Sequence, residues 1–224
     1  MNKSLEKLKQ LIEDFGFSAT DSAITNRIVI HGVAGSGKST LTKELAKDTN
    51  FNVVNILSKE EFNLAGQFIS KSLVTLENKI NVLDEYLAVD SHEGFQVLLV
   101  DPFQYKKKPY PANYIKNRSH RFKKELIPIL SEIGVELEVE EEGLEVIRGS
   151  AYEVEPEGQI ISVEEDVSEY VEKHGLQVHN SSCVQGQEFE VVTLYHKKDL
   201  KELDRSEVYI ALTRVKAKLK LLQL

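Results

Sequence analysis

Residues 32–39 carry the pattern G-x-x-x-x-G-K-[ST], whose residue types at this spacing bind phosphate groups. Glycines let the backbone fold around a phosphate chain with its N–H groups pointing inward, and the helix that follows favours negative charge at its N-terminus. Lys38 is expected to reach the β- and γ-phosphates of a nucleotide, and the Ser39 hydroxyl to ligate Mg²⁺. The predicted phosphate-binding residues are Gly32, Val33, Ala34, Gly35, Ser36, Gly37, Lys38, Ser39 and Thr40.

The flanking residues predict the strand and the helix that such a loop connects. Residues 27–31 form an apolar run typical of a buried strand, and residues 40–46 place Leu41 and Leu45 on one face of a helix. A glycine-rich turn with a chance lysine is the alternative, and the complete pattern in this context disfavours it.

Two acidic residues follow the apolar run 80–83, at a strand end where chemistry collects in parallel sheets. Asp84 is expected to hold Mg²⁺ through water, and Glu85 to polarise the attacking water as general base. An acidic turn without chemistry is the alternative for the pair alone. The position of the pair after Lys38 favours the catalytic interpretation.

Three further polar residues are candidates for a hydrolytic site. Gln104 follows the apolar run 96–100 in a proline-stiffened loop, and it could sense the γ-phosphate or orient water. Arg121 and Arg214 could each reach the γ-phosphate across a domain cleft, a contact that is worth roughly 10³–10⁵ in rate. For either arginine alone, a surface salt bridge is the more common role.

Composition places the chain among ordinary globular proteins: 224 residues, 41% hydrophobic, 29% charged and a net charge of −8. No apolar run approaches the roughly 20 residues that span a bilayer, so we expect no direct membrane span. Cys183 is the single cysteine, which excludes an intrachain disulfide and fits a reducing compartment. The six histidines lack the spacing of metal ligands.

Charge is unevenly distributed along the chain. Residues 106–124 are basic and carry interleaved tyrosines, whereas residues 132–145 are rich in glutamate. A basic, aromatic stretch can follow a phosphate backbone while its rings stack on bases, which would make it an interface for a nucleic acid. A solvated linker between domains is the alternative. The predicted RNA-binding residues are Lys106, Lys107, Lys108, Lys116 and Arg118.

Strand and helix patterns alternate in the first half of the chain, which predicts a parallel sheet with helices on both faces. An N-terminal surface helix carries Leu5, Leu8, Ile12 and Phe15, residues 51–56 predict a strand, and residues 58–61 look like a capping box that opens a helix. A shift in composition at 102–118 predicts the junction between domains 1–117 and 118–224.

The second half predicts a further set of strands and helices. Pro128 is expected to end or kink the first helix. The expected elements are a helix over 122–130, a half-exposed strand over 135–140, a helix over 164–174, a strand over 191–195, a helix over 206–216 and a closing strand over 219–222.

Together these features resemble the superfamily-one RNA helicases of positive-strand RNA viruses. Val100 stands where the third motif of that family usually has glycine. In the fifth motif, Gly186 and Glu188 are implied to close on nucleotide and strand. The six matching motifs lie at residues 32–40, 83–86, 100–104, 119–122, 184–189 and 209–214.

The short length narrows the resemblance to the potexvirus-like triple gene block protein 1 family. That resemblance implies an α/β fold of two small RecA-like P-loop NTPase lobes, with ATP and Mg²⁺ as cofactors. It implies an RNA-stimulated ATPase and RNA helicase that moves viral RNA from cell to cell and suppresses host RNA silencing. It also implies self-association, cooperation with viral coat protein and small membrane movement proteins, and a location in the host cytoplasm and at plasmodesmata.

Two other functions remain open at this point. The chain could act mainly as an RNA-binding, self-assembling transport or suppressor factor with minor ATP turnover, as the basic stretch suggests. A small-molecule P-loop kinase suits the length, but it does not suit the late motifs around Gly186 and Arg214, because a kinase needs a lid and an acceptor site instead.

Overall fold

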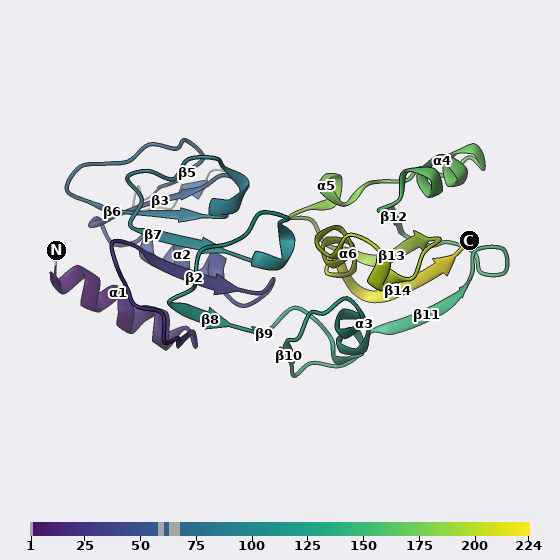
Figure 1. Ribbon diagram of the computed structural model, residues 1–224, viewed down its shortest axis with the longest axis horizontal. Coiled ribbons are helices and arrows are strands. Elements are labelled where there is room, and N and C mark those ends of the chain that lie inside the picture. Colours follow the sequence, from purple (N-terminus) through teal and green to yellow (C-terminus); the bar gives the residue numbers. More distant parts are fainter. Residues whose placement is uncertain (1, 58–60, 63–67) are drawn as a thin grey trace. The chain divides into compact units, whose positions relative to one another are not determined.

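The computed structural model describes residues 2–57, 61–62 and 68–224. The chain divides into two compact units, Met1–Arg118 and Ser119–Leu224, and each unit has its own sheet (Figure 1). Of the capping box expected at 58–61, the first three residues lie outside the described residues. Glu61 belongs to a two-residue strand instead of a helix.

The first unit is built on a sheet in which the described residues form eight strands. The inner strands are parallel, and the short β1 and β4 pair antiparallel at the two edges. In spatial order the strands are β1 (Ser18–Ala19), β8 (Tyr114–Lys116), β2 (Ile28–Gly32), β7 (Val97–Val100), β6 (Ile80–Asp84), β3 (Phe51–Asn55), β5 (Phe68–Ser70) and β4 (Glu61–Phe62).

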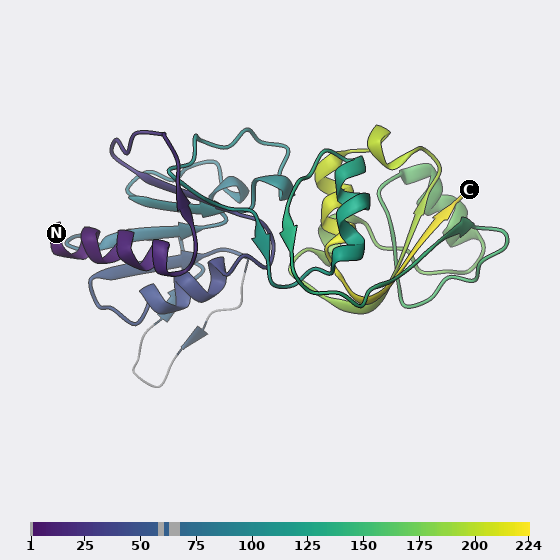
Figure 2. The same ribbon diagram turned by 90° about the horizontal axis from the view of Figure 1, so that it is seen from below.

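Alternate residues of the central strands point to opposite faces of this sheet, so each face has its own apolar cluster. Ile30 and Val82 pack on the side of α1 (Asn2–Asp14) and α2 (Lys38–Leu45). Figure 2 shows these two helices over one face of the sheet. The opposite face carries Leu83 and Leu98 with the 3₁₀ turn η1 (Tyr86–Ala88).

The second unit has a four-stranded, fully parallel sheet. Its order is β11 (Glu145–Ser150), β14 (Val215–Gln223), β13 (Phe189–His196) and β12 (Gln159–Ser162). The helices of this unit are α3 (Ile127–Glu132), α4 (Glu165–Lys173), α5 (Ser181–Val184) and α6 (Arg205–Leu212). Its remaining elements are the strands β9 (Arg118–Ser119) and β10 (Glu138–Val139) and the 3₁₀ turns η3 (Lys124–Leu126) and η4 (Leu200–Glu202).

The predicted α/β fold with parallel sheets flanked by helices is confirmed, and several element boundaries need correction. Pro128 lies in the first turn of α3, where its missing N–H is not needed, so it begins the helix instead of ending it. The strand expected over 135–140 shrinks to β10. The helix expected over 206–216 ends at Leu212, because the chain enters β14 at Val215.

The basic segment 102–118 is structured. It begins with the 3₁₀ turn η2 (Pro102–Gln104) and contains β8, which pairs in parallel with β2 inside the first sheet. The prolines and lysines of this segment therefore belong to an ordered part of the first unit, and they do not indicate a linker without contacts. Within the described part of the chain, no helix is long and apolar enough to cross a membrane.

Candidate active site

The loop between β2 and α2 has a backbone that only glycine fits at three positions. Gly35 and Gly37 have φ values of 78° and 99°, in the left-handed region that costs other residues energy. A Cβ on Gly32 would overlap the Ser36 hydroxyl oxygen. The loop therefore holds the curled path that lets backbone N–H groups surround a phosphate.

Two buried polar side chains line this loop. Lys38 Nζ donates to the Gly32 carbonyl at 2.7 Å and to the Val33 carbonyl at 3.3 Å. The Ser36 hydroxyl is fully buried, and among the described residues it has no hydrogen-bond partner. Ser39 is exposed in the first turn of α2, at the positive end of the helix. A buried cation, an orphaned hydroxyl and a helix N-terminus together fit a nucleotide phosphate chain.

Strand register brings the predicted acidic residues to the same edge of the sheet as the loop. Asp84, at the end of β6, lies opposite Asn55 of β3, whose side-chain amide donates to Asp84 Oδ2 at 2.8 Å. Asp84 is buried, and burial raises the pKa of its carboxyl although the nearby Lys38 ammonium opposes the shift. The Asp84 carboxylate and the Ser39 hydroxyl are hard oxygen ligands of the kind that Mg²⁺ prefers.

Glu85 follows in a strained backbone conformation, with φ 61° and ψ 44°. Burial and the neighbouring Asp84 charge raise the pKa of the Glu85 carboxyl to about 8, while Lys38 lowers it. The Tyr105 hydroxyl donates to Glu85 Oε2 at 3.0 Å, which also favours the carboxylate. A carboxyl group tuned toward neutral pH suits general-base chemistry.

The third strand end adds a buried acid and the predicted glutamine. Asp101 follows β7 and accepts hydrogen bonds from the Phe103 N–H at 3.1 Å and from the Gln104 side-chain amide at 2.9 Å. The Gln104 side chain is thereby held at this edge of the sheet. His31, near the end of β2, has its pKa lowered to about 4, chiefly by burial, so the ring is neutral at physiological pH.

The pKa of Glu85 predicts how ATP hydrolysis depends on pH. If Glu85 is the general base, kcat/KM should rise with pH through about 8, because only the carboxylate accepts a proton. Tyr105→Phe should move this rise to higher pH, because it removes a hydrogen bond that lowers the Glu85 pKa. Steady-state ATPase rates from about pH 6 to pH 9 test this, and a flat wild-type profile would contradict the role.

The site residues predicted in the second half of the chain gather in the second unit, near the amino ends of β13 and β14. Arg121 Nε lies 2.7 Å from Glu188 Oε1, and Lys216 Nζ lies 3.7 Å from the other oxygen of Glu188. Gly186 is exposed, with φ 81°, in the turn that leads into β13. Arg121, Gly186 and Glu188 are therefore neighbours within one unit.

Arg214 occupies the interior of the same region and is only 2% exposed. Its guanidinium donates to the Ile210 carbonyl at 3.0 Å, to the Gln187 carbonyl at 3.3 Å and to the Thr213 hydroxyl at 3.0 Å. These bonds tie α6 to the loop before β13. Arg214 therefore has a structural role within the second unit, and its contact with a phosphate stays a prediction.

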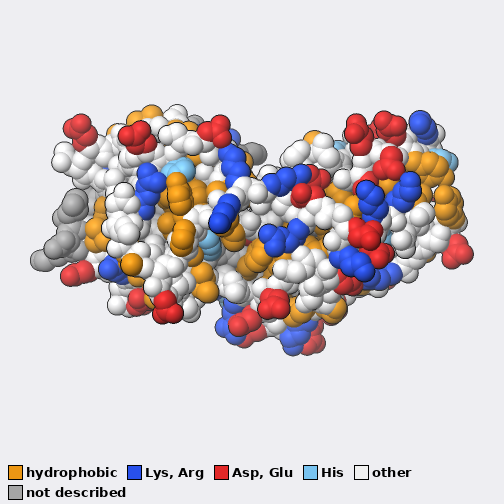
Figure 3. All heavy atoms as spheres, viewed as in Figure 1, with side chains coloured by type: hydrophobic (Ala, Val, Ile, Leu, Met, Phe, Trp, Pro, Cys, Tyr) orange, Lys and Arg blue, Asp and Glu red, His pale blue; other side chains and the backbone are white. Residues whose placement is uncertain are grey.

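The basic stretch is partly neutralised by acids. Lys107 pairs with Asp90 at 2.8 Å, while Lys123 pairs with Glu141 and Lys124 with Glu142. Figure 3 shows acidic and basic side chains next to one another over the second unit. Local pairing of the two charge runs explains how they coexist in an acidic chain.

The predicted RNA-binding residues differ in their surroundings. Lys116 Nζ donates to the Phe15 carbonyl at 2.8 Å and lies over the Phe17 ring, so this side chain packs inside the first unit. Lys106, Lys108 and Arg118 are exposed. The structure thus leaves some of these cations at the surface and commits Lys116 to a contact inside its own unit.

Sequence reasoning missed two residues that hold the acidic pair, Asn55 and Tyr105. Asn55 had a usable signal, because a polar residue that ends a buried strand lies beside the ends of its parallel neighbours. Tyr105 had none, because its contact with Glu85 depends on how η2 turns back over the sheet edge.

Comparison with known proteins agrees with this geometry. Residues 28–223 match the family described as the viral superfamily 1 RNA helicase core domain. Movement and silencing protein TGBp1 of Apple stem pitting virus is 33% identical over 96% of this chain and 98% of its own length. The protein of the same name from Papaya mosaic potexvirus is 32% identical over 89% of this chain and 87% of its own length.

Solved structures show the same fold at lower identity. A PRRSV helicase aligns over 89% of this chain with a TM-score of 0.59 and 16% identity. An arterivirus nonstructural protein 10 helicase, solved as a complex with DNA, aligns over 96% with a TM-score of 0.52 and 16% identity. The chain spans 53% and 57% of those two proteins.

The chain belongs to the viral superfamily 1 RNA helicases and, within them, to the family of movement and silencing protein TGBp1. The family expected from the six motifs is thus confirmed, as are the RecA-like parallel sheets.

Proposed function

We propose that this chain is an RNA-stimulated ATPase and RNA helicase that acts in cell-to-cell movement of viral RNA and in suppression of host RNA silencing. The observation that carries the proposal is the convergence of Lys38, Asp84 and Glu85 at one sheet edge, where Lys38 lowers the pKa of both acids. The names of the relatives support the two biological roles.

Residues of the first unit divide the chemistry of ATP hydrolysis among them. Lys38 and the loop N–H groups hold the phosphates, and Glu85 takes a proton from the attacking water, which Gln104 orients. Ser39 and Asp84 would hold Mg²⁺, which would neutralise charge on the phosphate oxygens.

The second unit supplies the remaining residues of the proposed ATPase and helicase. Arg121 and Arg214 contact the γ-phosphate, while Gly186 and Glu188 approach nucleotide and RNA. Hydrolysis removes the γ-phosphate that the arginines contact. The affinity for RNA bound across both units therefore differs before and after turnover. Stepping along RNA follows from that difference.

Nucleotide-dependent RNA affinity tests this coupling. Binding of a labelled single-stranded RNA should differ at least severalfold between the ADP state and a non-hydrolysable ATP state, and a partial duplex should be displaced only when ATP is hydrolysed. Equal affinities without strand displacement would instead favour an RNA-binding, self-assembling transport or suppressor factor with minor ATP turnover. The exposed cations of the basic stretch keep that alternative in view.

The basic stretch has its own test. Replacing Lys106, Lys107 and Lys108 with glutamine should reduce the slope of log affinity for single-stranded RNA against log salt by roughly 1–2, because fewer counterions are released. Lys107 contributes less than a solvated lysine because it pairs with Asp90. Replacing Lys123 and Lys124, which pair with Glu141 and Glu142, is the matched control. An unchanged slope in the triple variant would mean that the stretch does not contact RNA.

The biological setting is part of the proposal. Self-association, cooperation with viral coat protein and small membrane movement proteins, and action in the host cytoplasm and at plasmodesmata are roles that the family resemblance implies. Co-purification of the chain with each of these partners from infected tissue would test them.

A further inference from the structure

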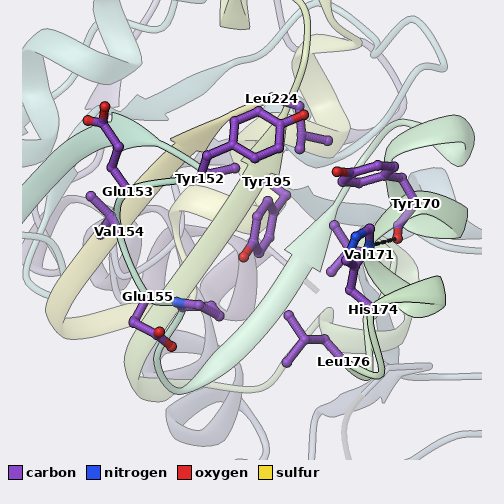
Figure 4. A pocket seen from close by; sticks show the side chains of 12 residues that line it. Tyr152, Glu153, Val154, Glu155, Tyr170, Val171, His174, Leu176, Tyr195 and Leu224 are labelled. Carbon is purple, nitrogen blue, oxygen red and sulfur yellow. Dashed lines mark hydrogen bonds between the residues drawn. The ribbon is translucent and has the colours of Figure 1, made fainter.

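The second unit holds a cavity of about 250 Å³ that the proposed ATPase does not use. Tyr152, Tyr170 and Tyr195 line it together with His174, and Figure 4 shows their rings around it. We call it the tyrosine pocket. Figure 3 shows hydrophobic side chains gathered at the same end of the second unit, near the C-terminus.

The tyrosine pocket lies at the opposite end of the sheet from the Arg121–Glu188 cluster. Tyr152 is the second residue after β11, Tyr195 is the penultimate residue of β13, and Leu224 follows β14. These are carboxyl ends of parallel strands, the edge at which open α/β sheets bind ligands. The Arg121–Glu188 cluster precedes β13, so residues of the tyrosine pocket can be changed without touching it.

Two of the three tyrosines of this pocket are exposed, and the third, Tyr195, is buried. Tyr152 is 72% exposed and Tyr170 is 38% exposed, so both rings are accessible to a partner. The neighbouring Tyr152 hydroxyl raises the pKa of Tyr170. The His174 ring lies 4.5 Å from the Tyr170 ring, centroid to centroid, and its Nδ1 lies 2.8 Å from the Tyr170 carbonyl oxygen.

Two carboxylate side chains are among the residues that line the tyrosine pocket. Glu153 and Glu155 are exposed, and within the described part of the chain neither has an ion-pair partner. The charge of Glu155 acts on Tyr195, whose pKa it helps to raise. Lys197 lines an adjacent hollow that shares Tyr152 and Tyr170 with the tyrosine pocket, and its ammonium group pairs with Asp166 at 3.3 Å.

We propose that the tyrosine pocket binds an arginine side chain of a partner protein. A guanidinium plane stacks on tyrosine faces, and the two carboxylates complement its charge. The volume of about 250 Å³ is below the roughly 300–1,000 Å³ typical of small-molecule sites, which suits one side chain. A nucleic acid is disfavoured because its phosphates would face Glu153 and Glu155.

Nuclear magnetic resonance of the 224-residue chain tests this with two probes. The first is the peptide Ser-Gly-Arg-Gly-Ser, and the second replaces arginine with citrulline, which has the same shape and no charge. The arginine peptide should shift the amide signals of residues 151–156 and 170–176 in a saturable manner, and the citrulline peptide should not.

Variants assign the binding to the rings and the carboxylates. Tyr152→Ala should weaken the affinity for the arginine peptide roughly three- to thirtyfold, and Glu155→Gln should weaken it in the same direction. Tyr110→Ala, which removes an exposed tyrosine of the first unit, is the matched control and should leave the affinity unchanged. Equal binding of the citrulline peptide, full affinity in Tyr152→Ala, or shifts of the same residues by single-stranded RNA instead would overturn the proposal.

Discussion

Replacing Lys38 with alanine is expected to reduce ATP hydrolysis to the background of the assay while the chain stays folded. The Lys38 ammonium is the buried cation of the phosphate-binding loop, and its charge lowers the pKa of both Asp84 and Glu85. Its loss removes the positive charge that offsets the phosphates and also pushes the general base toward its protonated form. Phosphate release, measured beside circular dichroism, separates lost chemistry from lost structure.

Lys79→Ala is the matched control, because Lys79 is an exposed lysine of the same unit. It should hydrolyse ATP at the wild-type rate. Near-normal hydrolysis by Lys38→Ala would remove the catalytic assignment of the loop and of every residue argued to act with it.

The second large effect separates the two arginines of the second unit. Arg121→Ala should slow ATP turnover by roughly 10³-fold or more with little change in melting temperature. Its ion pair with Glu188 is about one-third exposed, and such pairs contribute at most about 1 kcal/mol. Arg121 can therefore leave Glu188 for a phosphate at little cost in free energy.

Arg214→Ala should lower the stability of the chain as well as ATP turnover. The substitution removes one hydrogen-bond donor from each of the carbonyls of Ile210 and Gln187 and opens a cavity, a loss of roughly 2–5 kcal/mol in unfolding free energy. The melting temperature should fall by roughly 5–15 °C. Thermal melts and ATP turnover rates of both variants test these expectations. Full ATPase activity of Arg121→Ala would contradict the proposed contact between Arg121 and the γ-phosphate.

Central strands could be predicted from sequence far better than edge strands. Strands β2, β3, β6 and β7 are buried on both faces, so their apolar runs stand out. In the second sheet, β13 and β14 lie in the middle and were predicted, whereas the edge strands β11 and β12 were not. An edge strand such as β11, with little buried surface, lacks the apolar pattern that identifies a strand.

The candidate site divides in a similar way. The loop and the acidic pair could be predicted because their spacing follows from strand–loop–helix geometry. Val100, which replaces the usual glycine of the third motif, is the buried last residue of β7. The burial of Arg214 and the pairing of Lys123 with Glu141 could not be predicted. Both depend on tertiary packing that brings distant segments together.

ATP turnover by the purified 224-residue chain, measured with and without single-stranded RNA, tests the central claim most directly. An engine that couples hydrolysis to RNA should release phosphate several times faster when RNA is added, and Lys38→Ala should abolish both rates. A measurable rate that RNA leaves unchanged, or no hydrolysis in either condition, would contradict this account.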